Sequence, residues 1–122
     1  MTLQRWGLAT ALLPLLALAA GCHSYQVDAT VENRTGETIK LLEVDYPSAS
    51  FGTDALPSGA DYHYRFQIRG SGQVQVQYTE SGTNVVRKFT GPELHEKQEG
   101  RIVIALMPNA KTDFNAVLSP KP

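Results

Sequence analysis

The chain has 122 residues and only one cysteine, Cys22. A single cysteine excludes a disulfide within the chain, so a folded domain must be stabilised by packing. The net charge is −1, and this balance gives no basis for a nucleic-acid partner, which requires a basic surface. The sequence also lacks repeats and any apolar run of about 18 residues, the length that spans a membrane as a helix.

Helical periodicity is absent too. No long segment carries apolar residues at spacings of three and four, the pattern of an amphipathic helix. Alternating apolar and polar residues recur instead between turn-forming clusters, such as Asn33-Arg34-Thr35-Gly36. These runs predict an all-β domain with strands over 27–31, 39–46, 51–56, 62–69, 74–79, 85–90, 101–107 and 112–118.

With the segment over 112–118 as an optional last strand, about seven short strands in roughly 100 residues predict a small antiparallel β-sandwich of immunoglobulin-like type. The Leu56-Pro57-Ser58-Gly59 segment resembles the Leu-Pro-x-Gly turn common in bacterial immunoglobulin-like domains. The Cys-Trp-Cys landmarks of antibody domains are absent, so the strand topology stays open.

The clearest local prediction is a hairpin. Apolar and polar residues alternate over 62–69 and again over 74–79, and Gly70-Ser71-Gly72 between them forms a turn. This loop pairs Ile68 with Val74, so one face is apolar and the other polar. We predict the polar face as the interaction surface, with a purely solvated face as the alternative; its residues are His63, Arg65, Gln67, Arg69, Gln73, Gln75 and Gln77.

The next segments are less regular. In the strand over 85–90, either Arg87 or Lys88 must lie on the core side, and the pattern does not choose between them. Residues 91–100 form a polar connection that favours one helical turn over 92–97. Residues 101–107 are apolar on both faces, which predicts a central strand, buried on both sides or shielded by the last segment.

No catalytic or metal-binding pattern is complete. His95 to Glu99 is close to the zinc-protease motif, but Glu99 stands where the second histidine is required. Glu43 and Asp45 are paired carboxylates that could act on sugars or bind calcium, although an exposed strand face is favoured. No nucleophile elbow and no phosphate-binding loop is present. We therefore expect no enzyme activity, no cofactor and no metal.

The N-terminal segment carries the strongest signal. Arg5 precedes an apolar run over 6–20 that is short for a membrane helix, and the run ends in Leu18-Ala19-Ala20-Gly21-Cys22. This ending resembles the lipobox of bacterial lipoproteins. The resemblance implies removal of residues 1–21 as a signal peptide and acylation of Cys22, including a palmitate-type chain. An ordinary secretory signal and an uncleaved anchor are the alternatives.

The resulting organisation is a signal peptide (1–21), an acylated cysteine with a short tether (22–26), a β-sandwich (27–118) and a frayed tail (119–122). The tether reaches about 14 Å at most, which keeps the domain beside its membrane. In Gram-negative lipoproteins, an aspartate just after the acylated cysteine is linked to retention in the inner membrane. This chain has His23 and Ser24 there instead, which favours the outer membrane of a Gram-negative cell.

From these features we expect a lipid-anchored, non-enzymatic module of the bacterial cell envelope. It would bind or assemble with a membrane-proximal protein partner. The alternative is a binder of a small ligand, a metal or a glycan, through His63 or through Glu43 with Asp45. An enzyme is the third and weakest hypothesis.

Overall fold

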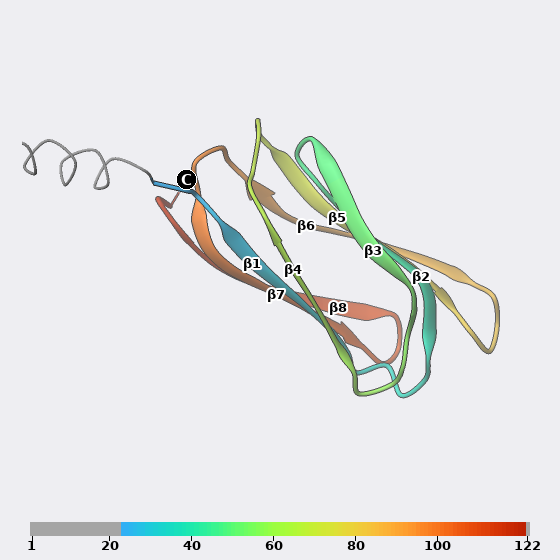
Figure 1. Cartoon of the computed structure of the whole chain (residues 1–122). Coiled ribbons are helices and arrows are strands. Elements are labelled where there is room, and N and C mark those ends of the chain that lie inside the picture. The colour runs from blue at the N-terminus through green and yellow to red at the C-terminus, as the bar shows by residue number, and fades with distance from the viewer. Residues whose placement is uncertain (1–22, 122) are drawn as a thin grey trace, which may run out of the picture.

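The computed structural model describes residues 23–121, which form a sandwich of two four-stranded sheets (Figure 1). The signal segment 1–21 and Cys22 lie outside the described residues, as does Pro122. The strands are β1 (Val27–Asn33), β2 (Ile39–Tyr46), β3 (Ala49–Leu56), β4 (Asp61–Phe66), β5 (Gly72–Glu80), β6 (Val86–Leu94), β7 (Glu99–Met107) and β8 (Lys111–Ser119). The predicted all-β sandwich is confirmed, with eight strands rather than about seven.

The strand order is β4-β1-β7-β8 in one sheet and β3-β2-β5-β6 in the other. The first and second strands therefore lie in different sheets, whereas the immunoglobulin constant-type arrangement keeps them together. The β1 and β7 strands also pair in parallel, so the sandwich is not wholly antiparallel. The immunoglobulin-like part of the prediction is not confirmed. No helix among residues 23–121 is long and apolar enough to cross a membrane.

Alternation along the central strands builds the core between the sheets. On β1, the predicted inward residues Val27, Ala29 and Val31 are all buried. On β7, the inward residues are at most 1% exposed, and the outward residues Val103, Ala105 and Met107 are half-buried. This strand lies between β1 and β8, so its predicted central position is confirmed. Each valine, leucine or isoleucine buried here stabilises the fold by about 1.5–3 kcal/mol.

The predicted hairpin over 62–79 is wrong. The β4 strand pairs with β1, and β5 pairs with β2 and β6, so the two predicted partners lie in opposite sheets. The connection between them crosses the sandwich, and Ile68 within it is 1% exposed in the core. Alternation of apolar and polar residues shows which side of a strand is apolar. It does not show whether the apolar sides of two strands face each other across the core or lie side by side in one hairpin.

The connection over 91–100 also differs from its prediction. Residues 91–94 continue β6 and residues 99–100 begin β7, which leaves a short turn at Glu96 and Lys97 and no helical turn. Gln98 in this turn is 2% exposed. Its side chain accepts a hydrogen bond from the His95 amide at 2.8 Å and donates one to the Pro120 carbonyl at 3.0 Å. These bonds hold the β6–β7 connection to the segment after β8.

Both ends of the described chain lie at the same end of the sandwich (Figure 1). The Gly100 amide donates a hydrogen bond to the Gln26 carbonyl at 3.1 Å, and the His23 ring lies 3.0 Å from the Glu99 carboxylate. We call this end of the sandwich the tether end. The β2–β3, β4–β5 and β6–β7 connections also lie there.

The β5–β6 hairpin resolves the register that the sequence left open. Arg87 lies on the core side, opposite Tyr78, and Lys88 points outward beside Gln77. The Arg87 Nε donates a hydrogen bond to Glu80 at 2.7 Å, and the Thr83 hydroxyl donates another at 2.8 Å. The bond from Arg87, followed by that from Thr83, holds the pKa of Glu80 below its ordinary value of 4.5.

Replacing Glu80 with glutamine should make stability less sensitive to acid. Because the pKa of Glu80 is lower in the folded chain than in the unfolded one, its ionisation stabilises the fold above about pH 4.5. That contribution is lost as the pH falls through the folded value. Urea unfolding at pH 7, 5 and 3 should show the free-energy gap between wild type and Glu80→Gln shrinking toward pH 3. A gap that stays constant with pH would contradict this account.

Candidate interaction surfaces

The predicted interaction face is divided between the two sheets. His63 and Arg65 lie on the outer side of β4, whereas Gln73, Gln75 and Gln77 lie on the outer side of β5 in the opposite sheet. Because the outer sides of a sandwich point away from each other, no single partner surface contains all seven residues. Gln67 and Arg69 lie between these strands, in the connection at the tether end, and both are exposed.

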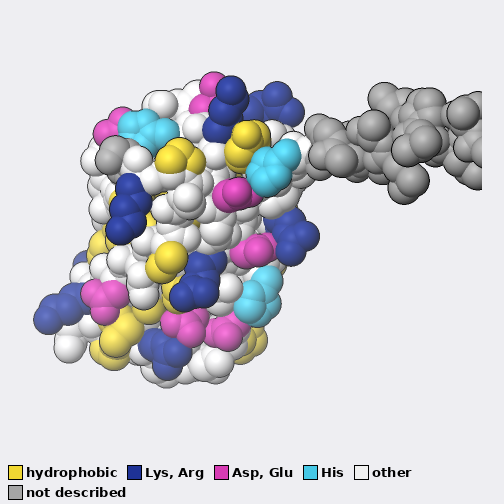
Figure 2. Space-filling model, turned by 90° about the vertical axis from the view of Figure 1, so that its left-hand side faces the viewer, with side chains coloured by type: hydrophobic (Ala, Val, Ile, Leu, Met, Phe, Trp, Pro, Cys, Tyr) yellow, Lys and Arg dark blue, Asp and Glu magenta, His cyan; other side chains and the backbone are white. Residues whose placement is uncertain are grey.

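The β4 part of this face belongs to a surface of mixed charge. Asp28 on β1 lies in register between Arg65 on β4 and Arg101 on β7. The Arg65 Nε donates a hydrogen bond to Asp28 at 2.7 Å, and His63 Nδ1 lies 3.0 Å from the Thr30 hydroxyl. On the face drawn in Figure 2, basic and acidic side chains are interspersed rather than gathered by sign. Such a surface does not select a partner by its net charge.

Neither the paired carboxylates nor the near-motif at 95–99 is part of a cluster of metal ligands among residues 23–121. Glu43 and Asp45 are exposed on the outer face of β2, as predicted. Residues 23–121 contain no group of three or more His, Cys, Asp or Glu side chains placed to hold a metal ion. In the near-motif at 95–99, the Glu99 carboxylate lies against His23, and His95 Nε2 is 3.9 Å from Glu93.

A different surface stands out on the outer side of β2. Leu41 is 61% exposed and has a φ of 52°, a left-handed conformation that a leucine rarely adopts. It lies at a β-bulge, because the Lys40–Thr79 and Glu43–Gln77 pairs leave two residues on β2 opposite one on β5. Leu42 fills the inward position, so the extra residue, Leu41, is turned out to solvent.

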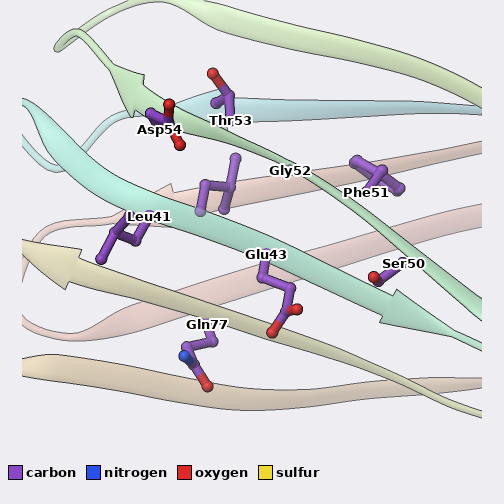
Figure 3. A pocket seen from close by; sticks show the side chains of 9 residues that line it. Leu41, Glu43, Ser50, Phe51, Gly52, Thr53, Asp54 and Gln77 are labelled. Atoms are coloured by element: carbon purple, nitrogen blue, oxygen red, sulfur yellow. The ribbon is translucent and has the colours of Figure 1, made fainter.

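The bulge is built against Gly52 of β3. A Cβ at this position would lie 2.0 Å from the Leu42 carbonyl oxygen, so only glycine fits. Without a side chain at Gly52, a shallow hollow of about 470 Å³ opens beside Glu43. Figure 3 shows Leu41, Glu43 and Gln77 projecting to the same side of the sheet, at the wall of this hollow.

The ionisable groups that line the hollow are both carboxylates, Glu43 and Asp54. Neither forms a salt bridge within residues 23–121, and neither does Asp45 two residues along β2. Val86 on β6 is 49% exposed on the same outer side, in the row that contains Thr79 and Lys40. We call this group the Leu41 surface: Leu41, Glu43, Asp45, Asp54, Gln77 and Val86.

Sequence reasoning missed this surface, although two signals were present. Ile39 and Leu42 are both buried but three residues apart, which breaks the two-residue period of the strand. An odd spacing between inward residues indicates an extra residue, and Gly52 within the neighbouring strand is a second sign of a bulge.

Comparison with known proteins gives the fold and no function. No protein-family model and no curated protein sequence matches the chain. The chain is similar to the NMR structure of a protein from Eubacterium rectale, with 16% sequence identity and a TM-score of 0.55. The match covers 84% of this chain and 97% of that one. At this identity the similarity concerns the fold alone, so function must be argued from the surface.

Proposed function

We propose that this protein is a lipid-anchored, non-enzymatic binding module of the bacterial cell envelope that docks a membrane-proximal protein partner. The lipobox-like segment ending at Cys22 supports the anchor, and His23-Ser24 favours the outer membrane in a Gram-negative cell. β1 begins at Val27, so the tether spans about 14 Å at most and the partner must approach the membrane surface.

The exposed Leu41 is the observation that carries the docking role. A left-handed conformation costs a residue other than glycine about 1–2 kcal/mol of folding free energy. Because most of the Leu41 side chain lies in water, burial of apolar surface does not offset this cost. Strained residues of this kind are concentrated at functional sites. The partner segment should therefore offer a pocket for an apolar side chain.

The charge of the hollow indicates the remaining chemistry of the partner. Glu43 and Asp54 have no cationic partner among the described residues, so a lysine or arginine on the docking segment would pair with them. Because Lys40 and Lys88 are also exposed on this outer side, we expect a local match. The partner segment would have one lysine or arginine opposite Glu43 and Asp54, and an apolar residue that contacts Leu41 and Val86.

The test is crosslinking of the acylated protein in its own membrane, with variants that differ only at the surface. Leu41→Gly should fold within about 1 kcal/mol of wild type, because glycine adopts the same φ without strain. It should nevertheless lose the crosslinked partner. The matched control is Val117→Ser, since Val117 is 53% exposed on the outer side of the other sheet. Recovery of the same partner with Leu41→Gly as with wild type would overturn the docking role.

The anchor is tested separately by Cys22→Ser. We expect this variant to leave the membrane fraction, because the thiol that carries the acyl chain is absent. Mass spectrometry of the wild-type N-terminal peptide should show an acylated cysteine. Membrane retention of Cys22→Ser in a form from which residues 1–21 have been removed would overturn the lipid anchor without affecting the docking result.

A further inference from the structure

One open edge of the sandwich lies where the edge strands β3 and β4 of opposite sheets approach each other. Aromatic rings cover the core along this edge. Tyr46 and Phe66 stack with centroids 4.0 Å apart, and Phe51 and Tyr64 stack at 4.6 Å with an interplanar angle of 17°. Tyr64 is nevertheless 40% exposed, so it presents aromatic surface to solvent.

A recess of about 410 Å³ adjoins these rings at the tether end. Tyr46, Tyr64 and Phe66 form its apolar wall, and the small Ser48 and Ala49 leave it open toward β3. Burial raises the pKa of Tyr46, so its hydroxyl stays protonated and uncharged around neutral pH. The aromatic wall of the recess is therefore uncharged, while most of the remaining lining is polar.

The rim of the recess is cationic. Arg65 is held by its single hydrogen bond from Nε to Asp28, which orients the guanidinium and leaves its terminal nitrogens available. Arg69 is exposed and forms no salt bridge within residues 23–121. Side-chain amides of Gln26 and Gln67 complete the rim and can donate to or accept from hydroxyl groups.

We infer that this recess, the Tyr64 recess, binds a sugar ring that carries a carboxylate, as part of an acidic glycan of the envelope. One face of the Tyr64 ring stacks on Phe51, and the part of the residue that stays exposed suits a sugar ring with apolar C–H groups, because an aromatic face carries partial negative charge. A guanidinium pairs with a carboxylate in a two-pronged way, which Arg69 is free to do. The glutamine amides suit the ring hydroxyls.

The recess lies close to the predicted membrane anchor, where a glycan of the envelope would be within reach. Gln26 lines it and lies four residues after Cys22, so the site is beside the point where the chain leaves for the membrane. It lies on a different part of the molecule from the Leu41 surface and shares no residue with it. The docking surface and the recess can therefore fail independently, whereas the envelope source of the glycan rests on the proposed lipid anchor.

The test is titration of the acylated protein, in detergent micelles, with a trimer of galacturonic acid. Binding is followed by calorimetry and by tyrosine fluorescence, since Trp6 lies within the predicted signal segment. We expect binding near the millimolar range, and at least about tenfold weaker binding for Arg69→Gln, because the paired guanidinium is lost. Tyr64→Leu keeps an apolar contact with Phe51 and should also weaken binding. Its melting temperature checks that the fold is intact.

Three controls separate this site from general charge effects. Arg101→Gln removes an exposed arginine on the outer side of β7 and should bind the acidic trimer like wild type. Maltotriose, a neutral trimer, should not bind, and benzoate should bind more weakly than the sugar acid. The proposal is overturned if wild type does not bind the acidic trimer, if Arg69→Gln binds it like wild type, or if benzoate binds more tightly.

Discussion

Gly52→Ala is expected to destabilise the fold by about 3 kcal/mol, near the upper end of the range for forcing extra atoms into a packed site. The new Cβ would lie 2.0 Å from the Leu42 carbonyl oxygen and 3.2 Å from the Glu43 Cα. Both neighbours are backbone atoms of β2, so relief requires β2 and β3 to separate or the bulge at Leu41 to collapse. The first adjustment breaks pairs between β2 and β3, and the second disturbs pairs between β2 and β5.

Urea unfolding followed by circular dichroism measures this effect, and the midpoint should fall by about 1–3 M for a change of that size. Gly72→Ala is the matched control in the same sheet. Its Cβ would meet only the Pro47 Cγ at 3.6 Å, an ordinary contact. Equal midpoints for Gly52→Ala and Gly72→Ala would show that the bulge is not built around a bare glycine.

Asn33→Leu is expected to have an effect of similar size, roughly 3 kcal/mol, for a different reason. Asn33 ends β1 and is fully buried. Its side-chain nitrogen donates hydrogen bonds to the carbonyls of Glu37 at 2.8 Å and Leu56 at 2.9 Å. Its oxygen accepts bonds from the amide and hydroxyl of Thr35. Leucine has the same branched shape and the same number of side-chain heavy atoms but is bulkier, so the variant removes the bonds and leaves no cavity.

The bond to Leu56 joins the two sheets, because β1 and β3 belong to different sheets. Without it, a buried carbonyl loses its partner, which costs more than an exposed bond would. The control is Asn115→Leu on the exposed outer side of β8, which should stay within about 0.5 kcal/mol of wild type. Melting temperatures of the two variants that differ little would contradict the bridging role of Asn33.

The sequence predicts where strands lie better than which strands pair. The bounds of β2 are those predicted, and the inward residues of β1 and the central place of β7 are confirmed. Pairing was wrong for β4 because Phe66 and Val76 are inward residues of opposite sheets rather than neighbours in one sheet. Alternation carries no information that distinguishes these two cases.

Side-chain roles that depend on distant segments were also not predictable. Asn33 was predicted as an ordinary turn residue, because nothing in its neighbourhood indicates a bond to Leu56. The Tyr64 recess is formed where β3 and β4 approach each other from different sheets, so its residues share no local pattern. The predicted polar face failed as one surface for the same reason, since it assumed that β4 and β5 were neighbours.

The place of β1 in its sheet gives the domain a direction of mechanical strength. A pull on the chain before Val27 enters through an interior strand, which is laddered to β4 on one side and to β7 on the other. The load runs along the strand axis and is shared in shear by both ladders. The last strand in the chain, β8, is an edge strand and is hydrogen-bonded only to β7. A pull through the tether is therefore resisted by ladders on both sides of β1, whereas tension through the C-terminal strand is resisted by one ladder alone.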